Sequence, residues 1–239
     1  MQADSKYTKV VRQQLELDDF LTGFSLSSPE KPQQQAQAKQ KAAELESIAG
    51  EVAGCYKCGL GSLRTNAVAG EGNADARIVF VGEGPGADED AQGRPFVGRA
   101  GQLLDKIIAA MGLKRSDVFI CNILKCRPPD NRDPRPEEII NCLPYLQRQI
   151  EIINPDIIVA LGAHAARTLL ETNKSIGQLR GRFQQYCPAI GRPPIKLMPT
   201  YHPAYLLRNY SAENRKRVWE DMQKVLTELG LPVPERGKR

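Results

Sequence analysis

The stretch RIVFVGEGPG, from Arg77 to Gly86, decides the fold class of this chain. Its first six residues form a short apolar run that stops at a glycine-rich turn, which is typical of a strand buried on both faces of a parallel sheet. Three later runs have the same character: VFICNIL (118–124), DIIVALG (156–162) and IKLMP (195–199). The pattern therefore predicts four buried strands.

The segments between these strands have helical spacing. In residues 100–111, Leu104, Ile108 and Met111 fall on one face of a helix. Further helices are predicted over 136–153, 163–170 and 211–229, the last with Ser211 as its N-cap. Strands that alternate with helices indicate an α/β fold, a three-layer sandwich with a central, mainly parallel four-stranded sheet flanked by helices.

The bulk composition limits the class of protein. With 239 residues, of which 41% are hydrophobic, the chain can bury a sizeable core. No run of about 18 apolar residues occurs and the N-terminus lacks a signal-peptide pattern, so we expect a cytoplasmic protein without a membrane span. The net charge of +5 is compatible with nucleic acid as a partner but does not establish it.

The N-terminal part differs from the rest of the chain. Residues 25–40 are rich in Ser, Pro, Gln and Lys, which favours a linker or disorder, and residues 36–48 could form a polar helix. We therefore divide the chain into a variable extension (1–48) that is partly disordered or helical, a main domain (49–230) and a C-terminal tail (231–239).

Chemically versatile residues cluster where the predicted strands end. Residues 82–86 follow the first strand, Asn122 lies in the second, and His202 comes just after the fourth. In parallel sheets ligands bind at the carboxyl ends of the strands, so one composite site is predicted there. A nucleotide-binding phosphate loop at GEGPG is the weaker interpretation, because no G-x-x-x-x-G-K-[ST] follows.

The cysteines suggest a metal site rather than disulfides, because the cytosol keeps thiols reduced. A C-x-x-C pair is followed by one cysteine in the KCRPP turn and another on the next helix. These four are the natural ligand quartet: Cys55, Cys58, Cys126 and Cys142. Their spacing leaves both structural zinc and a [4Fe–4S] cluster open. Cys121 reads as a small buried hydrophobe, and Cys187 lies in a loop without a partner.

Three motifs carry a family resemblance. GEGPGADEDAQGRPFVGRAGQLLDKII (82–108), NILKCRPPDNRDPRPEEIINC (122–142) and HPAYLLR (202–208) resemble, in this order, the signatures of the iron–sulfur, or family-four, uracil-DNA glycosylases. The likeness covers about residues 55–229. It implies hydrolysis of the N-glycosidic bond of uracil in single- and double-stranded DNA, the first step of base excision repair. It also implies a structural [4Fe–4S] cluster on the quartet, and we expect a monomer that binds uracil-containing DNA.

The resemblance also implies roles for single residues. Phe96 stacks on the uracil ring, Asn122 pairs with O4 and N3–H, and His202 hydrogen-bonds O2 as the uracil anion leaves. Gly82, Glu83 and Gly84 complete the substrate-binding set.

The residue that activates water is left open. The aspartate that positions water in the best-known uracil glycosylases would fall at Gly84, so Glu83 is a candidate, with Asp88 and Glu89 as alternatives. A relative that bonds covalently to the abasic sugar carries a basic insert ending in histidine after the second strand. This chain has no histidine there, which favours ordinary hydrolysis.

Contacts with the DNA backbone are expected from the loops around the site. Small residues allow close approach to phosphate, and cations attract it. The predicted DNA-binding residues are Pro85, Gly86, Arg99, Leu206 and Arg208, with Leu206 favoured over Leu207 as the wedge that replaces the flipped base. Lys125, Arg127 and Arg215 are further candidates for phosphate contacts.

Two other functions remain open from the sequence. The chain could be a non-catalytic nucleic-acid-binding module stabilised by a structural metal, or a glycosylase for another deaminated base.

Overall fold

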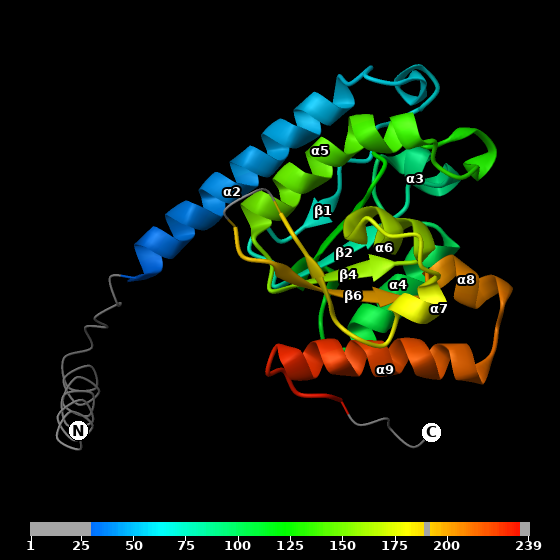
Figure 1. Cartoon of the computed structure of the whole chain (residues 1–239). Coiled ribbons are helices and arrows are strands. Elements are labelled where there is room, and N and C mark those ends of the chain that lie inside the picture. The colour runs from blue at the N-terminus through cyan, green and yellow to red at the C-terminus, as the bar shows by residue number, and fades with distance from the viewer. Residues whose placement is uncertain (1–29, 189–191, 235–239) are drawn as a thin grey trace, which may run out of the picture. The chain divides into compact units, whose positions relative to one another are not determined.

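Four parallel strands form the centre of the structure. The computed structural model describes residues 30–188 and 192–234 of the chain. The central strands lie in the order β3 (Phe119–Asn122), β2 (Ile78–Gly82), β4 (Ile157–Leu161) and β6 (Ile195–Thr200), as Figure 1 shows for three of them. The four predicted strands are confirmed, each shifted by two residues or fewer at its ends.

The sheet is wider than predicted. Two short strands extend it at its edges, β1 (Glu71–Gly72) antiparallel to β3 and β5 (Gln184–Tyr186) antiparallel to β6. The predicted number of strands is therefore too low, because the sheet has six strands within the described residues. Both edge segments are short and contain polar residues, so they lack the apolar run that identified the central strands.

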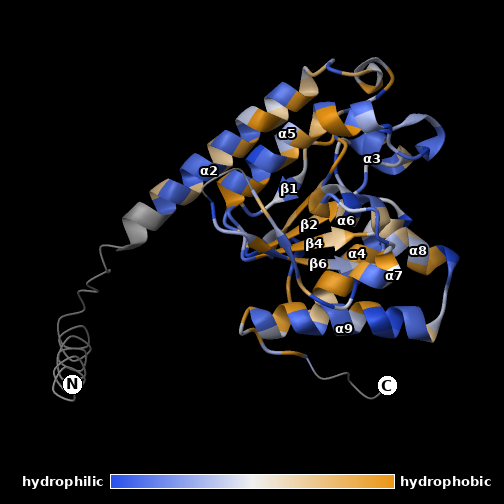
Figure 2. Cartoon of the chain, in the orientation of Figure 1, coloured by the Kyte–Doolittle hydropathy of each residue, from blue (hydrophilic) through white to orange (hydrophobic). Residues whose placement is uncertain are grey.

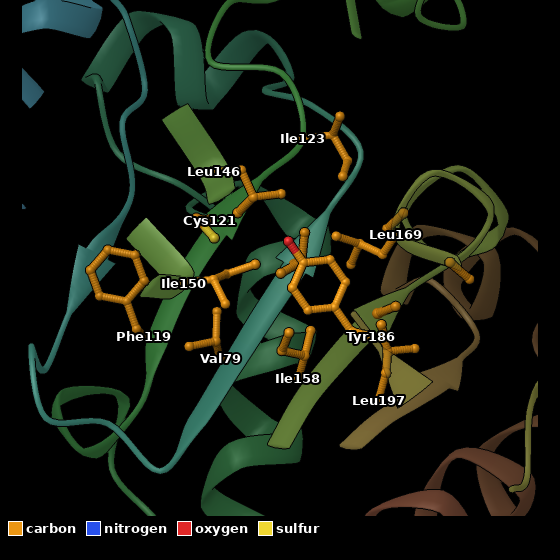
Figure 3. Close-up of a cluster of buried hydrophobic side chains, with 14 of the residues drawn as sticks. Val79, Phe119, Cys121, Ile123, Leu146, Ile150, Ile158, Leu169, Tyr186 and Leu197 are labelled. Atoms are coloured by element: carbon orange, nitrogen blue, oxygen red, sulfur yellow. The ribbon is translucent and has the colours of Figure 1, made fainter. Parts of the chain in front are cut away.

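Helices cover both faces of the sheet and complete the predicted three layers. The long covering helices are α4 (Arg99–Ala110), α5 (Pro136–Ile153), α6 (Ala163–Leu170) and α9 (Ala212–Glu228). Alternate residues of each strand point to opposite faces. Val79 and Val81 pack with α5 and α6, whereas Ile78 and Phe80 pack with α4 and α9. Figure 3 shows the first of these clusters, in which Ile150 of α5 meets strand residues.

The hydropathy of the elements follows from these positions. Figure 2 shows hydrophobic residues in the central strands, and β2 and β4 are buried along their whole length. The helix α9 is amphipathic and begins at the predicted cap, where Ser211 Oγ accepts a hydrogen bond from Asn214 N at 3.0 Å. Burial of the sheet on both faces explains why its strands read as continuous apolar runs.

The helix α2 (Glu30–Ala53) occupies part of the segment that we expected to be a linker. Residues 30–40 are helical rather than irregular, while residues 1–29 lie outside the described part. A compact unit begins at Gln40. Within it Ile48 and Val52 are buried against Tyr145 of α5. The division of the chain at residue 48 stays a prediction.

Several short elements lie in the connections between these strands and helices. They are α3 (Ala87–Gln92), α7 (Ile176–Leu179), α8 (Pro203–Arg208) and the 3-10 turns η1 (Gly59–Ser62), η2 (Arg115–Asp117) and η3 (Pro129–Asn131). Among the described helices, none is both long and apolar enough to cross a membrane.

Candidate functional site

A cavity of about 510 Å³ opens at the carboxyl ends of the parallel strands. Eight of the predicted site residues line it: Glu83, Gly84, Pro85, Gly86, Phe96, Asn122, His202 and Arg208. The composite site expected from the strand ends is thus present as one cavity.

Asn122 lies at the floor of this cavity, at the last position of β3. Its side chain is 1% exposed, and its Oδ1 has no hydrogen-bond partner, alone among the buried side-chain N and O atoms of the described residues. An unpaired buried acceptor costs about 1–3 kcal/mol, so this atom is suited to a ligand that donates a hydrogen bond. Gly82 on the neighbouring strand makes room for it, since a Cβ there would lie 2.3 Å from Asn122 Oδ1.

Phe96 lies beside Asn122 in a strained loop. Its φ of 52° is in the left-handed region, and the side chain is 5% exposed. The carboxylate of Glu89 holds this loop, because Oε1 accepts from Val97 N at 2.8 Å and from Gly98 N at 2.9 Å. The same carboxylate accepts from Gly86 N at 3.0 Å through Oε2, which ties the glycine-rich turn to the Phe96 loop.

His202 caps α8 and faces the cavity near Phe96. The ring centroids are 5.7 Å apart, and Nδ1 accepts a hydrogen bond from Ala204 N at 3.1 Å. Burial, assisted by the charge of Arg208, lowers the pKa of His202 to about 4. The imidazole is therefore neutral at pH 7, and the acceptor role of Nδ1 leaves the proton on Nε2. Gly162, at φ 94°, permits this approach, since a Cβ there would lie 2.9 Å from His202 Cβ.

The three acidic candidates for water activation differ in their surroundings. Glu83 lines the cavity with its carboxylate about one-third exposed, and burial raises its pKa. Glu89 has both oxygens engaged by backbone N–H groups, and Asp88 is exposed and does not line the cavity. Of the three, only Glu83 therefore combines a free carboxylate with access to the cavity.

Only some of the predicted DNA-binding residues line the cavity. Pro85, Gly86 and Arg208 line it, whereas Arg99 is exposed on the first turn of α4 and lies outside the lining. Leu206 is 3% exposed and Leu207 36%. A buried side chain cannot enter DNA without leaving its packing, so the exposed Leu207 is the better placed of the two, and the choice of the wedge stays a prediction.

Lys125 cannot contact phosphate, so that prediction is wrong. The side chain turns into the core and is 1% exposed. Its Nζ donates hydrogen bonds to Asn122 O at 3.0 Å and to Gln149 Oε1 at 2.6 Å. Burial lowers the pKa of Lys125. This lysine links the end of β3, where Asn122 lies, to α5.

Sequence reasoning missed several residues of the cavity wall. The polar ones among these are Asn131, Arg132, Asp133, His164, Tyr201 and Tyr205. His164 comes three residues after the end of β4, so the rule that identified Asn122 and His202 could also have found it. The loop that brings Arg132 and Asp133 to the cavity has no such signal.

The predicted cysteine quartet lies together at a second place. Cys55, Cys58, Cys126 and Cys142 all line one small cavity next to η1 and α5. Donors already point at the sulfur atoms: Arg64 Nη1 lies 3.0 Å from Cys126 Sγ, and Lys125 N lies 3.1 Å from Cys142 Sγ. Such donors suit thiolates, so the surroundings fit a metal–thiolate centre. The two other cysteines are apart from it, Cys121 buried in β3 and Cys187 exposed.

Comparison with known proteins agrees with this arrangement. Residues 69–223 match the family model described as "Uracil DNA glycosylase superfamily". A type-4 uracil-DNA glycosylase of Thermotoga maritima is 52% identical over 182 residues, which are 76% of this chain and 92% of the relative. Proteins of the same name are 50% identical in Saccharolobus solfataricus (76% of this chain, 84% of the relative) and 44% in Archaeoglobus fulgidus (80% and 96%). The chain therefore belongs to the uracil-DNA glycosylase superfamily and, within it, to the type-4 uracil-DNA glycosylases.

Proposed function

We propose that this protein hydrolyses the N-glycosidic bond of uracil in single- and double-stranded DNA and leaves an abasic site, as the first step of base excision repair. The observation that carries the proposal is the unpaired Oδ1 of Asn122 at the floor of the cavity. A base inside the DNA stack must be flipped out to reach such a site, and new hydrogen bonds and stacking must offset the cost of unstacking.

Asn122 selects the base through its two amide atoms. Oδ1 accepts the N3–H of uracil while Nδ2 donates to O4. Cytosine offers a bare N3 and an exocyclic amine, so it would leave both amide atoms unpaired in a buried place, and the site rejects it. Phe96, with its ring beside Asn122, provides the stacking surface.

His202 assists the departure of the base. When the bond between C1′ and N1 breaks, its electron pair stays on uracil and negative charge develops at O2. The neutral imidazole donates from Nε2 to that oxygen, because Nδ1 is held by Ala204 N. Its lowered pKa keeps the imidazole neutral through the physiological range.

Glu83 receives a proton from the attacking water. The water oxygen bonds to C1′ as the sugar becomes cation-like, and one water proton passes to the carboxylate. Backbone N–H groups engage both oxygens of Glu89, and Asp88 does not line the cavity, which supports Glu83 for this role. Gly82 and Gly84 leave room for the base and the water.

The DNA strand runs across the mouth of the cavity. Pro85 and Gly86 allow the backbone to come close, and Arg208 and Arg99 attract phosphate groups. Leu207, rather than Leu206, fills the gap that the flipped base leaves, since it is the exposed one of the pair. We expect the protein to act as a monomer in the cytoplasm.

The cysteine quartet holds a [4Fe–4S] cluster. A single zinc ion needs sulfur atoms about 3.8 Å apart, given Zn–S bonds of about 2.3 Å in a tetrahedron. Throughout the described residues, no three of the quartet's sulfur atoms lie within 4.8 Å of one another, which supports a larger centre. A cluster bound there would connect η1 with α5 and the turn after β3, and its role would be structural.

The test is to replace the residues that recognise and release the base. Asn122→Asp and His202→Ala should each slow single-turnover release of uracil by about 10²-fold or more, with thermal unfolding unchanged within a few degrees. Asn173→Asp, at an exposed position outside the cavity lining, is the matched control. Full activity in both cavity variants would refute the assignment.

A further inference from the structure

One wall of the cavity brings together three ionisable side chains from distant parts of the sequence. Glu83 follows β2, Asp133 lies in the loop before α5, and His164 lies in the first turn of α6. His164 Nε2 is 3.9 Å from Glu83 Oε2 and 3.5 Å from Asp133 Oδ1. One ligand atom of each residue lies within 4.8 Å of the others.

The three side chains differ in solvent exposure, and exposure decides how strongly each charge affects the pKa of its neighbours. The side chains of Glu83 and His164 are 32% and 33% exposed, whereas that of Asp133 is 81% exposed. Water screens an exposed charge more strongly, so His164 acts on Glu83 more than Asp133 does. At 3.9 Å, His164 Nε2 is too far from Glu83 Oε2 for a hydrogen bond, so the imidazole acts on this carboxylate through its charge.

We propose that His164 is a positioning residue that keeps Glu83 ionised for water activation, and that Asp133 opposes it. This inference rests on the proposed function, in which Glu83 takes a proton from the water that attacks C1′. A protonated Glu83 is too weak a base to take up that proton. A cationic imidazole beside it favours the carboxylate form, and a second carboxylate disfavours it.

The directions of the pKa shifts agree with this arrangement. Burial raises the pKa of Glu83, the charge of His164 lowers it, Asp133 raises it and Arg208 lowers it. These neighbours come from α6, from the loop before α5 and from α8, and they surround the carboxylate. Arg132 and His202 also line the cavity, but Arg132 is paired with Glu138 at 2.6 Å and His202 is neutral at pH 7.

The two neighbours can be removed one at a time with opposite results. His164→Gln removes the imidazole whose charge lowers the pKa of Glu83. The acid limb of uracil release should therefore move upward by about 0.7 pH unit, the shift expected for unit charges 4 Å apart in water. Asp133→Asn removes a negative charge and should move the limb downward by about 0.3 unit. A residue with a merely structural role would not give shifts of opposite sign.

The measurement is the single-turnover rate of uracil release from a single-stranded oligonucleotide between pH 4.5 and pH 8.5. At pH 8, on the plateau above the acid limb, the rates should agree within about threefold. Lys174→Gln, which removes an exposed charge just after α6 and outside the cavity lining, should leave the limb in place. Shifts of the same sign, or none, would overturn the inference although uracil is released.

A second readout does not depend on activity. ¹³C NMR of the glutamate side-chain carboxyl carbons, with Glu83 assigned by its loss in Glu83→Gln, reports the titration of this group directly. The same opposite shifts are expected there in His164→Gln and Asp133→Asn. Failure of uracil release in the wild-type protein would refute the proposed function, whereas an unmoved Glu83 titration would refute this inference alone.

Discussion

A single added methyl group tests the packing of the base-recognition site. Gly82→Ala places a Cβ 2.3 Å from Asn122 Oδ1 and 2.5 Å from Phe96 Cζ. Ordinary contact begins near 3.4 Å, so both side chains would have to retreat by about 1 Å. Gly82 does not have a positive φ, so the backbone accepts alanine and the effect comes from the collision alone.

The expected loss of activity follows from this displacement. A misplacement of about 1 Å costs on the order of 10²-fold in rate, because the reacting groups are no longer held in the productive geometry. Overpacking should also lower the free energy of unfolding by about 1–3 kcal/mol, which a stable domain tolerates. The variant should therefore fold but release uracil about 100 times more slowly.

Single-turnover uracil release and urea unfolding measure the two effects separately. Gly50→Ala in α2 is the matched control, because a Cβ there meets no atom within 4 Å. A Gly82→Ala protein that releases uracil within about threefold of the wild-type rate would show that the positions of Asn122 and Phe96 do not limit the reaction.

Three further predictions concern protonation, the metal centre and stability. His202 has a pKa of about 4 in the folded protein and near 6.5 in the unfolded chain, so between these pH values only the unfolded chain binds the proton. The free energy of unfolding should therefore fall by about 3 kcal/mol as the pH drops from 6.5 to 4. Urea titrations should show a smaller fall in His202→Gln. Cys142→Ala should lose its iron by elemental analysis, whereas exposed Cys187→Ala should keep it. Arg180→Ala should cost about 3–5 kcal/mol in urea unfolding, because it leaves the buried carboxylate of Asp221 without its cationic partner at 2.8 Å and with only the hydrogen bond from Thr200 Oγ1. A loss below 1 kcal/mol would contradict this.

The central sheet could be predicted because its strands are buried on both faces. Such strands read as apolar runs, and β2 and β4 are fully buried. The edge strand β5 could not be found in this way, since Gln184 and Gln185 are polar and their place is set by pairing with β6. This pairing cannot be predicted from the residues of β5 alone.

The same contrast applies to the site. Asn122 and His202 could be predicted because they stand at strand ends, and the quartet because cysteine is rare and chemically specific. Which of Leu206 and Leu207 is exposed depends on how the helix α8 is rotated about its axis. A helix of six residues is too short for its hydrophobic periodicity to predict that rotation. Asp133 reaches the cavity through the course of a loop, which tertiary contacts decide.

The most direct test is an assay on a labelled single-stranded oligonucleotide that contains one uracil, without added metal and with alkali to cleave abasic sites. We expect a break at the uracil, and none when thymine or cytosine takes its place. Absence of the break, from protein that holds its iron, would contradict the assignment of this cavity to uracil.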